Sequence, residues 1–157
     1  MKGADKTEDI TLRGARLLLI VGPYYRAVTD QLVAGAERAA KAAEAAVDRV
    51  DVPGAFEIPA AIVYAACAHV YDGYVGLGCV VRGETSHYDY ICGESARGLM
   101  DLSVREGYAI GYGILTVSTL AQAEERADIS RGDKGGEAAR ACLRMIALKR
   151  RFRGALG

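Results

Sequence analysis

Short apolar runs alternate with helix-like stretches along the first third of the chain. Residues 16–22 (RLLLIVG) form an apolar run that ends in glycine, typical of a strand buried on both faces. Residues 29–46 are rich in alanine, with small residues at helical spacing, and predict a helix. Residues 47–52 alternate apolar and polar positions like a strand, which Pro53-Gly54 would stop.

The same alternation continues through the middle of the chain. Residues 57–70 predict a helix from near Pro59, because proline is accepted in a first turn. Residues 74–81 predict a third strand, and a helix follows from Tyr88 to about Arg105. Residues 109–117 predict a fourth strand, whose glycines indicate that another segment comes close to its backbone.

The last third of the chain predicts two further helices. Thr119 and Gln122 have capping-box spacing at a helix start. Residues 128–136 look like a polar loop, and the final helix has an apolar face and a basic end, residues 148–153. The basic end favours stabilisation of the helix dipole over nucleic-acid binding. Four strands alternating with helices predict one α/β domain, residues 1–157, with a parallel sheet covered on both faces as an α-β-α sandwich.

Composition narrows the class of protein. The 157 residues are 51% hydrophobic, and 20 basic side chains balance 20 acidic ones. A zero net charge gives no overall field for nucleic acid or an anionic membrane. No apolar stretch is long enough to span a bilayer, and the first residues lack the apolar core of a signal peptide. We expect a cytoplasmic protein.

The cysteines and histidines give little support for a metal site. Four cysteines lie in apolar surroundings without a Cys-x-x-Cys pair, so we expect small buried hydrophobic residues: Cys67, Cys79, Cys92 and Cys142. The two histidines are far apart in the sequence, which argues against zinc. A nucleophilic pair of Cys79 and His87 is conceivable, but only Arg82 nearby would lower the thiol pKa.

Polar and aromatic residues follow the predicted strands, where ligands bind in such sheets. Tyr24 follows the first strand, Phe56 and Glu57 the second, and His87 the third, while Arg126 lies on the helix after the fourth. The sequence contains no dinucleotide fingerprint, P-loop or nucleophile elbow. This pattern predicts a small-molecule site served by His87, with a possible anionic ligand, and does not identify the reaction.

Each candidate also has a structural interpretation. His87 would cap a helix or face solvent, and Tyr24 and Phe56 would belong to the core. Glu57 would stabilise a helix dipole, and Arg126 would pair with neighbouring carboxylates. Lys134 would be a surface lysine whose charge opposes the dipole at a helix start, a cost that a bound anion would relieve.

Three segments resemble the signatures of the 6,7-dimethyl-8-ribityllumazine synthase family: VPGAFEIP (52–59), RGETSHYDYI (82–91) and KGGEAA (134–139). The resemblance implies a flavodoxin-like fold with a four-stranded parallel sheet of order 2-1-3-4. It implies condensation of 5-amino-6-ribitylaminouracil with 3,4-dihydroxy-2-butanone 4-phosphate in riboflavin biosynthesis, without a cofactor or metal.

The resemblance also assigns roles to particular residues. His87 matches the proposed general acid/base. The turn at Glu84 and Thr85 and the guanidinium of Arg126 match the phosphate site. The pyrimidine and ribityl contacts match Tyr24, Ala55, Phe56, Glu57, Cys79, Val80, Val81, Tyr112 and Lys134.

The family likeness further implies a homo-oligomer with active sites between subunits. A pentamer is expected, with a decamer or a shell of sixty subunits as alternatives. Ser130 stands where many shell-forming members carry lysine, which favours a pentamer or a pair of pentamers. An additional N-terminal strand is possible, and residues 1–12 are expected to be flexible or to pair with a neighbour. The rival function is a non-catalytic flavin- or pteridine-binding module on the same scaffold.

Overall fold

A four-stranded parallel sheet of order β2-β1-β3-β4 forms the centre of the molecule. The computed structural model describes residues 10–155. The strands are β1 (Arg16–Val21), β2 (Ala46–Asp51), β3 (Gly73–Val81) and β4 (Ala109–Val117). The helices are α1 (Arg26–Ala42), η1 (Ala55–Glu57), α2 (Ile58–Ala66), α3 (His87–Arg105), α4 (Leu120–Ala127) and α5 (Lys134–Ala155). This arrangement confirms the predicted flavodoxin-like α/β fold.

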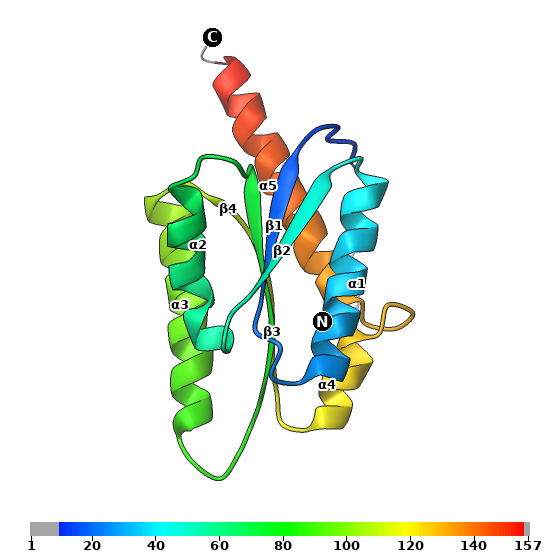
Figure 1. Ribbon diagram of the computed structural model, residues 1–157, viewed down its shortest axis with the longest axis vertical. Coiled ribbons are helices and arrows are strands. Elements are labelled where there is room, and N and C mark those ends of the chain that lie inside the picture. The colour runs from blue at the N-terminus through cyan, green and yellow to red at the C-terminus, as the bar shows by residue number, and fades with distance from the viewer. Residues whose placement is uncertain (1–9, 156–157) are drawn as a thin grey trace.

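The sheet lies between two helical layers, with α2 and α3 on one face and α1, α4 and α5 on the other (Figure 1). Successive side chains of β1 point to opposite faces of the sheet, so this strand contributes to the hydrophobic core on each face. Leu17 and Leu19 face the α1 and α5 layer, whereas Leu18 and Ile20 face α2 and α3. All four side chains are at most 5% exposed. The sequence of β1 is therefore continuously apolar because both of its faces are buried.

Two local predictions hold in detail. Thr119 caps α4, since the Gln122 backbone N donates to Thr119 Oγ1 at 3.2 Å and the Thr119 backbone N donates to Gln122 Oε1 at 3.3 Å.

The glycines of β4 allow α5 to approach closely. A Cβ at Gly111 would collide with the backbone of Ala138.

Several expected boundaries differ from the structure. The first helix begins at Arg26 and ends at Ala42, earlier than residues 29–46. The predicted helix over 57–70 is η1 followed by α2, which ends at Ala66. The last helix begins at Lys134, so residues 134–136 belong to α5 and not to a loop.

The N-terminal expectations lie largely outside the described residues, which begin at residue 10. Within the described part, Ile10 and Leu12 pack against the α1 and α5 core, and the Leu12 backbone N donates to Ala43 O at 2.8 Å. No helix among residues 10–155 is long and apolar enough to cross a membrane.

Close packing of α1 against α5 predicts a large stability effect. A Cβ added at Gly135 would overlap the backbone carbonyl of Leu32, so we expect Gly135→Ala to lower the free energy of unfolding by about 1–3 kcal/mol. Gly154→Ala is the matched control in the same helix, because a Cβ there meets no atom within 4 Å. Its effect should stay within about 0.5 kcal/mol in denaturant titrations. Equal effects of the two variants would contradict this packing.

Candidate active site

A cleft of about 730 Å³ lies beyond the carboxyl ends of β1 and β3, against η1 and the start of α3. This volume is within the range of small-molecule sites. Eight residues singled out from the sequence line it: Tyr24, Ala55, Phe56, Glu57, Cys79, Val80, Val81 and His87.

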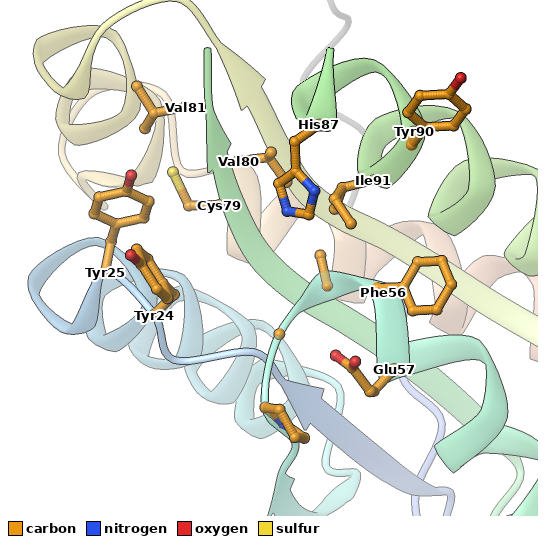
Figure 2. Close-up of a pocket in the computed structure, with 13 residues that line it drawn as sticks. Tyr24, Tyr25, Phe56, Glu57, Cys79, Val80, Val81, His87, Tyr90 and Ile91 are labelled. Atoms are coloured by element: carbon orange, nitrogen blue, oxygen red, sulfur yellow. The ribbon is translucent and has the colours of Figure 1, made fainter. Parts of the chain in front are cut away.

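Aromatic side chains stand on two sides of this cleft (Figure 2). Tyr24 is 78% exposed and meets Tyr25 edge-on, with ring centroids 4.9 Å apart. Phe56 is 54% exposed and projects from η1. Neither Tyr24 nor Phe56 belongs to the core of this chain, so the core interpretation of these aromatics was wrong. Exposed aromatic walls suit a flat ring ligand.

The exits of β1 and β2 are held together by a glycine. A Cβ at Gly22 would come within 2.8 Å of the Gly54 carbonyl carbon and 3.0 Å of the Ala55 backbone N. The segment that carries Phe56 and Glu57 is thereby placed directly against the end of β1. Only glycine permits this approach without moving the backbone.

His87 is the first residue of α3 and points from that helix toward η1 (Figure 2). Its side chain is exposed, and its backbone N donates to Thr85 Oγ1 at 3.3 Å. Glu57 lines the same cleft at the start of α2. An imidazole and a carboxylate therefore face one space lined by aromatic rings, which suits proton transfer on a polar heteroaromatic ligand.

The surroundings of Cys79 do not favour a nucleophilic thiol. Burial raises the pKa of the Cys79 thiol to about 11. A nucleophilic cysteine needs the opposite shift, because the thiolate is the reactive form. Cys79 therefore serves as a small apolar wall residue.

The expectation that all four cysteines are buried is only partly correct, and their different exposure predicts the order in which they react. Cys79 and Cys142 are buried as expected, but Cys92 is half-buried and Cys67 is exposed at the end of α2. We expect iodoacetamide at pH 8 to label Cys67 and to spare Cys79. With a pKa near 11, roughly one in a thousand Cys79 thiols is ionised at that pH. Peptide mass mapping shows which cysteine is labelled first. Labelling of Cys79 before Cys67 in the folded protein would contradict the prediction.

A second cleft, of about 470 Å³, lies along β4 and the first turns of α5. Three more of the predicted residues line it: Tyr112, Arg126 and Lys134. Tyr112 is 48% exposed, and burial raises the pKa of its hydroxyl. Lys134 Nζ pairs with Glu137 Oε2 at 2.7 Å. This cleft supplies cations and an aromatic ring but contains neither histidine.

Arg126 is available for an anion. Its Nη1 donates to the backbone carbonyl of Gln122 at 3.2 Å, and within residues 10–155 no carboxylate oxygen lies within 4 Å of its guanidinium. The expected pairing with Glu124, Glu125 or Asp128 is absent from the described residues. A guanidinium without a carboxylate partner suits a bound phosphate.

The predicted site residues thus fall into two clefts that share no lining residue. Glu84 and Thr85 lie in the exposed loop between β3 and α3 and line neither cleft. Among the described residues, no group of three or more histidine, cysteine, aspartate or glutamate side chains is placed to hold a metal ion.

Comparison with known proteins decides the family. The family described as 6,7-dimethyl-8-ribityllumazine synthase matches residues 14–150. The synthase of Methylobacterium radiotolerans is 53% identical over 152 residues, covering 97% of this chain and 93% of the relative. The chain belongs to the 6,7-dimethyl-8-ribityllumazine synthase family. The lumazine synthases of Azorhizobium caulinodans (50% identity, 96% of this chain, 94% of the relative) and Novosphingobium aromaticivorans (51%, 88% and 99%) are similarly related.

The structure also adds residues that the sequence analysis did not assign to the site. Tyr90 and Ile91 line the first cleft, three and four positions after His87 on α3. Side chains three and four positions apart share a helix face. Counting these spacings from His87 would therefore have identified both residues from the sequence. In this lumazine synthase family member they extend the α3 side of the cleft beside the imidazole (Figure 2).

Proposed function

We propose that the chain condenses 5-amino-6-ribitylaminouracil with 3,4-dihydroxy-2-butanone 4-phosphate in the first cleft. The products are 6,7-dimethyl-8-ribityllumazine, phosphate and water, as in the penultimate step of riboflavin biosynthesis. The observation that carries this assignment is the combination of family membership with an imidazole facing a cleft walled by exposed aromatic rings. The amine and the ketone are intrinsically reactive, so holding them in the right orientation supplies much of the catalysis.

The pyrimidine ring lies between the aromatic walls. Tyr24 and Phe56 provide ring faces, and Glu57 accepts hydrogen bonds from the polyol chain. The end of β3, from Cys79 to Val81, offers backbone donors and acceptors to the ring edge. The tyrosine hydroxyl at position 24 adds one polar group to the stacking surface.

His87 moves the protons of the reaction. Schiff-base formation, loss of phosphate and ring closure each transfer a proton near neutral pH, for which an imidazole is suited. The exposed position of His87 at the mouth of the cleft lets it reach the joined substrates. Thr85 and Glu84, in the preceding loop, present backbone N–H groups to the phosphate.

The phosphate-binding cations come from a second subunit. Arg126, Lys134 and Tyr112 line a cleft that lacks His87, so one chain does not bring all the assigned groups together. A head-to-tail contact that places the second cleft of one subunit over the first cleft of the next joins them. Such heterologous contacts close into rings, and we propose a ring of five subunits in the cytoplasm.

A non-catalytic flavin-binding module on this scaffold is the alternative from another class. It would retain Tyr24, Phe56 and Glu57 but would need neither His87 nor Arg126. The exposed His87 and the Arg126 guanidinium without a carboxylate partner favour the enzyme.

The direct test mixes the purified protein with both substrates and follows formation of the lumazine by its absorbance. Turnover well above the uncatalysed rate, with release of stoichiometric phosphate, is the expected result. A rate equal to the background would contradict the enzymatic function and leave the binding module.

A further inference from the structure

The loop that joins β3 to α3 is held by few bonds from its own side chains. Residues 82–87 are all exposed. Ser86 makes no side-chain capping bond at the start of α3, and a Cβ at Gly83 would meet no atom within 4 Å. Thr85 Oγ1 accepts a hydrogen bond from the His87 backbone N at the end of this loop. Since the loop places both Thr85 and His87, contacts with the strand and helix on either side of it are needed to fix it.

Arg82 connects the two ends of this loop. Its backbone N donates to Val117 O at 2.9 Å, which anchors it to the end of β4. Its guanidinium carbon lies 4.4 Å from the centroid of the Tyr88 ring, and its Nη1 lies 3.8 Å from Asp89 Oδ1. Tyr88 and Asp89 directly follow His87, so the side chain of Arg82 reaches from the sheet to the first turn of α3.

The ring beneath the guanidinium is partly buried. Tyr88 is half-buried, and burial raises the pKa of its hydroxyl. As the second residue of α3, it is carried by that helix. A planar guanidinium stacks on such a ring, which a lysine ammonium cannot do.

We propose that Arg82 is a positioning residue for the reaction. By stacking on Tyr88 and facing Asp89, it fixes the backbone of residues 83–87 and so the place of the His87 imidazole. The guanidinium of Arg82 faces Tyr88 and Asp89 and lines neither cleft, so we expect it to act through the loop. This inference rests on the proposed function of His87.

Kinetics of Arg82→Gln, Arg82→Lys and Arg13→Gln test the proposal. We expect Arg82→Gln to lower kcat about tenfold and to raise KM for the butanone phosphate several-fold. KM for the pyrimidine substrate should stay within about twofold, because other segments form its ring site. Arg82→Lys keeps the charge without the planar stacking and should recover only part of the loss. Arg13, in an exposed pair with Glu44, is the matched control and should behave as wild type.

The opposite results would overturn the positioning role. Wild-type kinetics in Arg82→Lys, or a raised KM with unchanged kcat in Arg82→Gln, would give Arg82 a role through charge alone. Wild-type kinetics in Arg82→Gln would remove any role.

Hydrogen exchange of the backbone amides tests the same proposal without turnover. In the substrate-free protein we expect the hydrogen-bonded amides of His87, Asp89 and Tyr90, whose acceptors are Thr85 and Ser86 of the loop, to exchange about tenfold faster in Arg82→Gln than in wild type and Arg13→Gln. Unchanged exchange in Arg82→Gln would overturn the proposal. If the wild-type protein forms no lumazine, the proposed function fails, while this measurement still decides whether Arg82 holds the loop.

Discussion

Replacing Arg126 by glutamine should raise KM for the butanone phosphate by about 10²-fold, because two charge-assisted hydrogen bonds to phosphate are lost. Arg126 has no carboxylate partner within 4 Å among residues 10–155, so the substitution leaves no buried charge unpaired and should not destabilise the fold. KM for the pyrimidine substrate should change little, since we propose that its ring binds in the other cleft. Steady-state kinetics with each substrate varied in turn measure both constants.

The matched control is Arg38→Gln, an exposed arginine on α1 that lines neither cleft. It should leave both KM values as in wild type. Equal effects of the two substitutions would show that net charge and not a phosphate site is responsible. A loss confined to kcat in Arg126→Gln would contradict its role in binding.

Replacing His87 by asparagine should lower kcat by about 10²-fold with KM values nearly unchanged, because proton transfer by a positioned group is lost. Part of the rate should return when imidazole is added to the buffer, since the vacated space opens into the cleft. Stopped-flow absorbance of lumazine formation with saturating substrates gives the rate.

The second histidine of the chain provides the control. His69 is exposed beyond α2 and has a φ of 53°, a backbone conformation that asparagine tolerates. His69→Asn should therefore retain wild-type kcat. If His87→Asn kept the wild-type rate as well, the histidine in the cleft would have no part in proton transfer.

Local signals in the sequence were sufficient for the elements of the fold. The apolar run of β1 identified a strand buried on both faces, and the spacing of Thr119 and Gln122 located the start of α4. Burial at the end of a helix was harder to predict. Cys67 sits among alanines and looked buried, but α2 ends at Ala66, so the following turn carries the thiol to the surface.

The pattern of residues in the sequence could not predict that the site residues fall into two clefts. From the sequence, Arg126 and His87 were expected to lie in one site, because both follow the carboxyl ends of neighbouring strands. In the structure α4 runs back along the face opposite α3, which turns Arg126 toward the edge of β4. That separation depends on which face each helix covers, and no local sequence signal specifies it. Only the resemblance to the family implied that active sites lie between subunits. The separation of the assigned residues into two clefts supports that expectation.

A mixed-subunit experiment tests the central claim, that each active site joins the first cleft of one subunit to the second cleft of its neighbour. His87→Asn and Arg126→Gln chains are co-expressed, and lumazine formation at subsaturating butanone phosphate is compared with each variant alone. In randomly mixed rings about one quarter of the interfaces pair an intact His87 with an intact Arg126, so activity should return to about a quarter of wild type. Activity no greater than the average of the two separate variants would show that each site is contained within one chain.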